Sequence, residues 1–153
     1  MLAETDRLII SKFTKEDAPF FLELVTSPNW IRFIGDRKIT TIAEARQHIE
    51  QGHLRSYKTY GYGFYKILLK TENNKPIGTC GLIKRETLEH PDIGFAMLPA
   101  YEGMGIGFES STKILELAAS IYKLKTVLAI TLPNNTASIK LLKKLGLSYQ
   151  KMI

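Results

Sequence analysis

Three glycines at alternate positions separate a strand-like segment from a helix-like segment. Gly103, Gly105 and Gly107 follow the apolar run 92–98, and an amphipathic stretch begins at Phe108. Glycine allows positive φ and close backbone approach, so successive N–H groups can converge on an anion. The helix start adds unsatisfied donors and a partial positive charge. The pattern favours a phosphate or pyrophosphate site, although a flexible loop or an ordinary helix entry would also carry such glycines.

Two common nucleotide-binding signatures are absent from the sequence. No G-x-x-x-x-G-K-[ST] string of the Walker type occurs. A dinucleotide G-x-G-x-x-G fingerprint would need glycine where Phe108 or Ser110 stands, and it also needs an acidic residue about 20 positions further on, where 121–127 contains none. Both interpretations are excluded.

A second polar segment, Pro133 to Ser138, lies where a strand-like run passes into a helix-like run. The amide of Asn135 can bridge backbone groups of a neighbouring loop, and the early-helix hydroxyl of Ser138 can donate to a leaving group. Asn135 as an ordinary helix N-cap explains the same pattern, and both roles can hold together.

Other reactive side chains give no second site. The single cysteine, Cys80, excludes an internal disulfide framework and is expected to be a buried, inert thiol. His48 and His53 are five residues apart with no Cys or Asp cluster nearby, so no metal is expected. No apolar run approaches the roughly 18 residues of a membrane span, and the N-terminus lacks a signal-peptide pattern. The expected location is the cytoplasm.

The net charge of +6, with a pI near 9.4, favours an anionic ligand. Nucleic acid, a phosphate-bearing cofactor and an anionic surface all fit that charge. The basic residues are scattered, with no run of five, so a dedicated basic tail is absent and nucleic acid is not the expected partner.

The length of 153 residues predicts one domain, 1–153. The mixture of predicted strands and helices along it indicates the α/β class, with a mixed sheet covered by helices. Thr14 and Asp17 predict a capping box before the first helix. The segment 126–132 is typical of a strand covered on both faces. The predicted strands are 8–13, 62–69, 77–83, 92–98, 126–132 and 148–152. The predicted helices are 20–25, one from Thr41 to Gly52 with Ile42, Ala45 and Ile49 on its buried face, 108–122, and 136–145, which Gly146 ends.

Several motifs together resemble the GNAT superfamily of acetyl-CoA-dependent N-acetyltransferases, in the branch that acetylates ribosomal-protein N-termini. The loop 102–107 fits the superfamily's pyrophosphate motif [QR]-x-x-G-x-[GA], except that Glu102 occupies the Gln/Arg place. The resemblance covers nearly the whole chain. Its other matching segments are 7–18 for the opening strand and helix, 34–37 for the following loop, and 135–138 followed by 143–147.

The resemblance implies a twisted sheet whose fourth strand, 92–98, splays from the fifth, 126–132. The pantetheine arm of acetyl-CoA lies in that slot, and a backbone N–H near Met97 or Leu98 polarises the thioester carbonyl. Asn135 would contact the cofactor or an ordered water, and Ser138 would face the sulfur. The pyrophosphate would lie on the main chain of Gly103, Met104, Gly105, Ile106, Gly107 and Phe108.

The reaction needs only a weak general base. An α-amine has a pKa of about 7.7–8.0, whereas a lysine at about 10.4 needs far more help, so positioning plus a modest base acting through water is sufficient. Many superfamily members use a tyrosine acid at the position of Leu142, so Ser138 is the donor candidate here. Asp92 is the preferred base and Glu102 the second, and a solvated charge is the alternative for either.

The predicted function is acetyl transfer from acetyl-CoA to a primary amine, most plausibly a protein N-terminus, by direct attack in a ternary complex. The alternatives are a CoA-binding module with weak or no turnover, a small-molecule amine acetyltransferase, and an RNA-associated binder supported by charge alone. The family's seventh strand is missing from this sequence, which predicts an exposed sheet edge or one covered by a partner subunit in a homo-oligomer. Tyr60 and Tyr62 are candidates for the acceptor groove, and Lys140, Lys143 and Lys144 for the 3′-phosphate.

Overall fold

The described residues form a six-stranded sheet, in the order β1-β2-β3-β4-β5-β6. The computed structural model describes residues 2–36 and 38–148. Neighbouring strands run antiparallel except for β5 and β6, which are parallel. The strands are β1 Ala3–Glu4, β2 Leu8–Lys12, β3 Phe64–Leu69, β4 Lys75–Ile83, β5 Asp92–Met97 and β6 Leu128–Ala129. The predicted hairpin of 62–69 with 77–83 is therefore confirmed as β3–β4.

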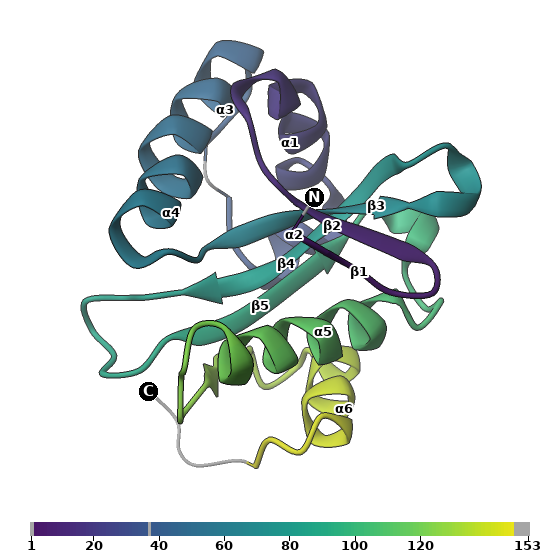
Figure 1. Cartoon of the computed structure of the whole chain (residues 1–153). Coiled ribbons are helices and arrows are strands. Elements are labelled where there is room, and N and C mark those ends of the chain that lie inside the picture. The colour runs from purple at the N-terminus through teal and green to yellow at the C-terminus, as the bar shows by residue number, and fades with distance from the viewer. Residues whose placement is uncertain (1, 37, 149–153) are drawn as a thin grey trace.

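Helices lie on both sides of this sheet, with α1, α3 and α4 on one side and α5 and α6 on the other (Figure 1). This arrangement confirms the predicted mixed α/β class. The α-helices are α1 Ala18–Val25, α2 Pro28–Phe33, α3 Ile42–His48, α4 Arg55–Tyr60, α5 Ile106–Ser120 and α6 Thr136–Lys144. Three short 3₁₀ turns cover Lys15–Asp17, Lys70–Glu72 and Pro99–Tyr101, and a π-helical turn covers Ile49–Leu54.

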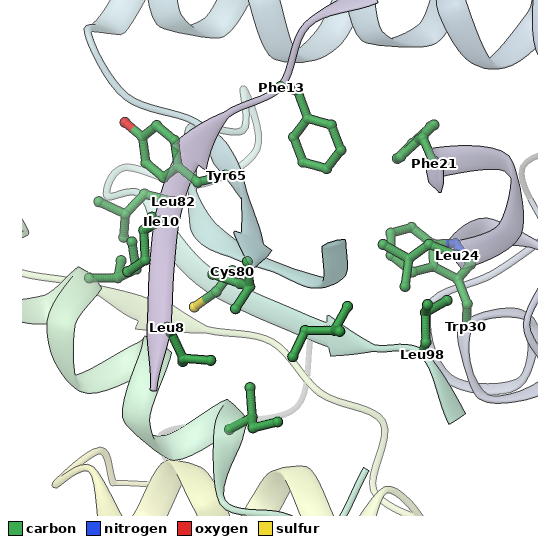
Figure 2. Packing of buried hydrophobic residues seen from close by; sticks show 14 of the residues in the cluster. Leu8, Ile10, Phe13, Phe21, Leu24, Trp30, Tyr65, Cys80, Leu82 and Leu98 are labelled. Atoms are coloured by element: carbon green, nitrogen blue, oxygen red, sulfur yellow. The ribbon is translucent and has the colours of Figure 1, made fainter. Parts of the chain in front are cut away.

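The core lies between the sheet and its helical layers. In β3 the buried residues Tyr65, Ile67 and Leu69 alternate with half-exposed ones, as expected for a strand with two different faces. The central strand β4 is buried continuously from Ile77 to Leu82, because both of its faces are covered. Figure 2 shows how residues from β2, α1, β3 and β4 meet in this cluster. Cys80 belongs to it and is fully buried, as predicted.

The entry into α1 is also confirmed. The N–H of Thr14 donates to the carboxylate of Asp17 at 2.8 Å, which gives the predicted capping box with the shorter acid. The next helix, α2, was not predicted, because Ser27-Pro28 is typical of a breaker. Pro28 instead occupies the first turn of α2, where its missing N–H costs nothing.

The predicted helix end at Gly52 is wrong. The helical backbone continues from α3 through the π-helical turn and α4, and it stops at Gly61, which has a φ of 80°. Burial of Ile49 and His53 four residues apart holds the helix against the sheet past Gly52. Ile42 was predicted on the buried face but is 45% exposed.

The prediction of a long, doubly covered strand at 126–132 is also wrong. The strand β6 has two half-exposed residues, and Ile130 and Leu132 beyond it are 42% and 44% exposed. The predicted last strand, 148–152, lies outside the described residues except for Ser148. Among the helices described, none is long and apolar enough to cross a membrane.

Candidate active site

The glycine loop joins the end of β5 to the start of α5, as the sequence predicts. Gly103 and Gly105 have φ of 74° and 76°, in the left-handed region that favours glycine. Gly105 is the N-cap of α5. Gly107 serves a different purpose, since a Cβ there would lie 2.9 Å from Cδ1 of Leu141 on α6. The third glycine therefore allows α6 to pack closely on the first turn of α5.

The N–H groups of this loop are available to a ligand. Within the described part of the chain, no group accepts a hydrogen bond from the N–H of any residue from 103 to 108, and the first donor of α5 with a partner is Glu109, to Gly105 at 3.1 Å. Six consecutive donors at the positive end of a 15-residue helix form a site suited to a diphosphate.

The edge of β5 that leads to this loop lacks a strand partner over most of its length, and this open edge is the predicted slot. The two strands β5 and β6 pair only at Asp92 with Leu128 and at Ile93 with Ala129. Beyond Ile93, none of the described residues pairs with that edge of β5. The sheet thus splays at the predicted pair of strands, the fourth and fifth of the family numbering, which are β5 and β6 here.

The two predicted backbone donors at the end of β5 differ in their availability. The N–H of Leu98 donates to the carbonyl of Ile77 at 2.8 Å, and its carbonyl accepts from Tyr101 at 2.9 Å. Hydrogen-bonded positions alternate along an antiparallel pair, so the N–H of Met97 points away from β4, into the slot. Of the two, Met97 is the one that can reach a ligand in the slot.

Asn135 and Ser138 lie at the start of α6. The side-chain oxygen of Asn135 accepts from the N–H of Ser138 at 3.3 Å, which confirms the predicted N-cap. Ser138 is half-buried, and its hydroxyl has no hydrogen-bond partner among the residues described. Because Leu141 contacts the Gly107 region, Ser138 lies roughly 4.5 Å further along the helix axis from that contact.

The candidate base Asp92 lies at the opposite end of β5, five residues or roughly 17 Å before Met97. Its side chain is buried, and Arg85 donates to both carboxylate oxygens, at 2.8 and 3.3 Å. Burial raises the pKa of Asp92 above its usual value, and the hydrogen bond and charge of Arg85 oppose that rise. The carboxylate is therefore held in place at the paired end of the slot.

The second candidate base, Glu102, lies immediately before the glycine loop and is exposed. Asn29 of α2 donates to its carboxylate at 2.6 Å. The acid at the motif's Gln/Arg place thus links the loop to α2.

Aromatic and basic side chains from the sequence analysis lie at two further places. Tyr60 is 47% exposed and stacks on Tyr62 at 5.9 Å, and Tyr62 is buried against Tyr122. Lys144 of α6 lies over the ring of Phe108 at 4.3 Å, beside a hollow of about 390 Å³ between α5 and α6. No group of three or more His, Cys, Asp or Glu that could hold a metal occurs among the residues described.

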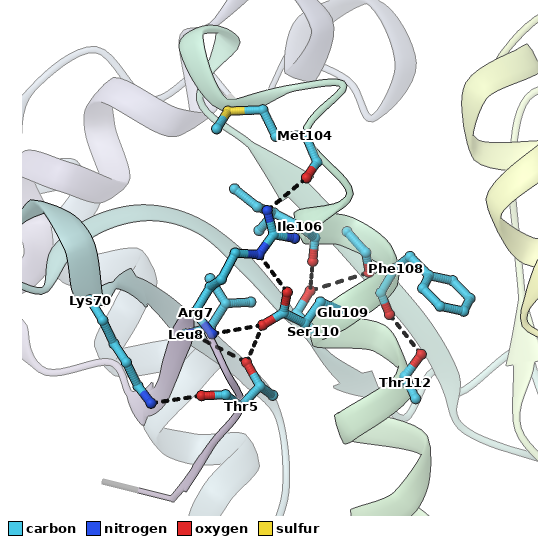
Figure 3. Close-up of polar contacts among 11 residues, drawn as sticks. Thr5, Arg7, Leu8, Lys70, Met104, Ile106, Phe108, Glu109, Ser110 and Thr112 are labelled. Atoms are coloured by element: carbon cyan, nitrogen blue, oxygen red, sulfur yellow. Dashed lines mark hydrogen bonds and ion pairs between the residues drawn. The ribbon is translucent and has the colours of Figure 1, made fainter.

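Sequence reasoning missed a polar network that ties the β1–β2 turn to the glycine loop (Figure 3). Arg7 donates through Nη1 to the carbonyl of Met104 at 2.9 Å and through Nε to Glu109 at 2.7 Å. The backbone N–H of Arg7 and the hydroxyl of Thr5 donate to the other oxygen of Glu109. Arg7 and Glu109 are 102 residues apart, so no spacing in the sequence indicates their contact.

The family is shown by a match over nearly the whole chain. The model of the acetyltransferase (GNAT) domain matches residues 7–148, and the chain belongs to this family. It is therefore an acyltransferase. It is 30% identical over 149 residues to an uncharacterized N-acetyltransferase, p20, of Bacillus licheniformis, an alignment that covers 96% of this chain and 81% of the relative. An uncharacterized N-acetyltransferase YoaA of Bacillus subtilis (strain 168) is 24% identical over 95% of this chain and 81% of its own length.

Solved structures share the fold. An acetyltransferase from Agrobacterium tumefaciens str. C58 has a TM-score of 0.80 at 21% identity, over 94% of this chain and 81% of that one. The ribosomal-protein-S5-alanine acetyltransferase from Vibrio fischeri has a TM-score of 0.78 at 19% identity, with the same coverage. RimL, a ribosomal alpha-N-protein acetyltransferase in complex with coenzyme A, has a TM-score of 0.80 at 17% identity over 94% and 81%.

Proposed function

We propose that this chain transfers the acetyl group of acetyl-CoA to a primary amine, and that the acceptor is a protein N-terminal α-amine. The observation that carries the proposal is the row of six N–H groups, 103–108, with no described partner, at the open edge of β5. Acetyl-CoA supplies a diphosphate for such a row and an activated thioester for the slot beside it.

The choice of acceptor has support from the named relatives. One relative at 30% identity is an N-acetyltransferase by name. Two proteins with the same fold are named as acetyltransferases of ribosomal proteins. An α-amine with a pKa of about 7.7–8.0 is partly neutral at pH 7, so it needs a weaker base than a lysine side chain does.

The positions described above support a binding role for each of these groups in the proposal. The amides of residues 103 to 108 bind the diphosphate, and Lys144 beside Phe108 meets the 3′-phosphate. The N–H of Met97 donates to the thioester oxygen, where negative charge develops as the amine attacks. Asn135 orders the start of α6 and so the hydroxyl of Ser138.

In the proposed acetyl transfer one bond to carbon forms, one bond to carbon breaks and protons move. The amine nitrogen forms the new N–C bond, and the C–S bond breaks. The hydroxyl of Ser138 gives a proton to the leaving sulfur and regains one from solvent. The amine proton passes to water and on to Asp92, with Glu102 as the second candidate base. Since Asp92 lies roughly 17 Å from Met97 along β5, a chain of several water molecules must connect it to the reacting nitrogen.

A second candidate function is a CoA-binding module with slow turnover. The pairing of Asp92 with Arg85 favours it, because a carboxylate already bound by a cation is a weaker base. A small-molecule amine as acceptor differs from the leading proposal only in the substrate.

One assay separates these functions. The assay follows the release of free CoA thiol by wild type, Ser138→Ala, Asp92→Asn and a surface control, Ser120→Ala. Each protein is given three acceptors in turn. They are a peptide with a free α-amine, the same peptide with that amine blocked and a lysine retained, and a polyamine. We expect turnover with the free α-amine only, kcat lowered about 100-fold by Ser138→Ala, and no change in the control. Binding of acetyl-CoA without turnover would identify the CoA-binding module, and turnover with the polyamine alone would identify a small-molecule acetyltransferase. No binding at millimolar acetyl-CoA would overturn the proposal.

A further inference from the structure

The peptide between Met104 and Gly105 has one side-chain contact that fixes its orientation. Gly103 and Gly105 both take left-handed conformations around the exposed Met104, and no backbone N–H among the described residues donates to the Met104 carbonyl. The guanidinium of Arg7 donates to the Met104 carbonyl at 2.9 Å. Nη2 of Arg7 lies 3.5 Å from where a Cβ on Gly105 would stand, so the group packs directly against the loop.

The direction of that carbonyl determines the direction of the next N–H. In a trans peptide the C=O and the N–H point to opposite sides. No cis peptide occurs among the residues described. Because the Met104 carbonyl points toward Arg7, the N–H of Gly105 points away from it. Arg7 therefore orients one of the six donors through the peptide rather than by touching the ligand.

Arg7 also controls a carboxylate at the same helix end. Glu109 lies in the first turn of α5, where an acidic side chain is attracted to free N–H groups and can fold back on them. Arg7 and Thr5 instead hold both of its oxygens on the side of the β1–β2 turn. Burial acts to raise the pKa of Glu109, but the hydrogen bonds from Thr5 and Arg7 outweigh it and leave the pKa below its usual value. Glu109 thus stays charged at neutral pH, and only its position prevents competition with a bound anion.

We propose that Arg7 is a positioning residue for the diphosphate: it fixes the 104–105 peptide and keeps the Glu109 carboxylate away from the loop amides. This inference rests on the proposed function, since it assumes that the amides bind the diphosphate of acetyl-CoA. It assigns to the β1–β2 turn a role in cofactor affinity.

An acetyl donor that has no diphosphate provides the test. Arg7→Met keeps the apolar stem of the side chain and removes the guanidinium. Lys113→Met is the matched control, because Lys113 of α5 carries the same charge and lines the same hollow of about 510 Å³ as Arg7. We expect Arg7→Met to raise the Kd and KM for acetyl-CoA at least tenfold with kcat little changed. The kcat/KM for S-acetyl-pantetheine, which has no diphosphate, should stay within twofold of wild type. Lys113→Met should match wild type with both donors.

The role of Glu109 is tested by the double variant Arg7→Met/Glu109→Gln. Removing the competing charge should recover at least threefold of the acetyl-CoA affinity lost in Arg7→Met. Should Arg7→Met fail to fold, Arg7→Lys, which can hold Met104 or Glu109 but not both, is expected to give an intermediate Kd. Wild-type affinity in the Arg7 variants, or an equal loss with S-acetyl-pantetheine, would overturn this inference alone. A wild-type chain that binds no acetyl-CoA would overturn the proposed function as well.

Discussion

Arg85 holds the carboxylate of Asp92 through two hydrogen bonds, from Nε to Oδ1 at 2.8 Å and from Nη2 to Oδ2 at 3.3 Å. The carboxylate is buried at the start of β5, whereas the side chain of Arg85 is 41% exposed. The pair connects the two ends of the loop between β4 and β5, and it sets the protonation of the candidate base.

Replacing Arg85 should move the acidic limb of the pH–rate profile to higher pH. Burial raises the pKa of Asp92 and Arg85 opposes that rise. In Arg85→Gln the charged carboxylate loses its partner, so its pKa rises further and activity is lost at a higher pH, by about one unit or more. The measurement is kcat/KM against pH, and Arg85→Lys, which keeps the charge, should shift less. An acidic limb that stays in place in both variants would mean that Asp92 is not the titrating base.

Gly103→Ala should weaken acetyl-CoA binding beyond its effect on stability. An added Cβ meets nothing within 4 Å, so its cost is the left-handed conformation, about 1–2 kcal/mol for a residue with a Cβ. Gly61→Ala is the matched control, because Gly61 has a φ of 80°, equal space and a position at the end of α4. Denaturant unfolding should show a similar loss of unfolding free energy in both variants. Calorimetric titration should show a Kd for acetyl-CoA raised at least fivefold in Gly103→Ala only. Equal affinity in the two variants would contradict a binding role for the loop.

Tyr57→Phe should destabilise the fold without changing cofactor affinity. The Tyr57 hydroxyl accepts from the N–H of Phe13 at 3.0 Å and donates to the carbonyl of Phe64, so it bridges the ends of β2 and β3. Its loss leaves two backbone groups without a partner, at a cost of about 1–3 kcal/mol. Tyr60→Phe, at an exposed ring, should change the free energy of unfolding by less than about 0.5 kcal/mol. A Tyr57→Phe loss as small as that of the control would show that the hydroxyl bridge is not needed where the pairing of β2 with β3 ends.

His53 should make the fold sensitive to acid. His53 lies in the π-helical turn, and its ring packs against those of Phe13 and Phe21. Burial, followed by the charge of His48, lowers the pKa of His53 to about 3. The neutral ring stabilises the fold fully above the unfolded pKa of about 6.5, and that stability is lost as pH falls from there toward 3, by up to about 1.4 kcal/mol per pH unit. His53→Phe should flatten this slope in urea unfolding between pH 7 and pH 4. The same slope in both proteins would rule His53 out as its source.

Local patterns predicted what local interactions determine. The glycine loop, the Asn135 cap and the Thr14–Asp17 capping box each depend on residues within a few positions of one another. The helix end at Gly52 failed because a glycine ends a helix only where its backbone turns left-handed, and burial of Ile49 and His53 carried the helix on to Gly61. A β-rich run at 126–132 looks the same with one neighbouring strand or two, so the splay that shortens β6 was visible only through the family resemblance.

Long-range contacts were beyond prediction. The pairing of Arg7 with Glu109 joins residues 102 apart, and the sequence carries no periodic signal for it. The same holds for Asn29 with Glu102, which explains how an acid is accommodated where the family motif has Gln or Arg.

The most direct test of the diphosphate site is amide NMR of the ¹⁵N-labelled chain, titrated with acetyl-CoA and with S-acetyl-pantetheine. We expect acetyl-CoA to shift the six amide signals of residues 103–108 more than any others in the chain, and S-acetyl-pantetheine to leave those signals in place while moving that of Met97. Loop signals that remain unmoved at saturating acetyl-CoA, or that move equally with both donors, would contradict the diphosphate site.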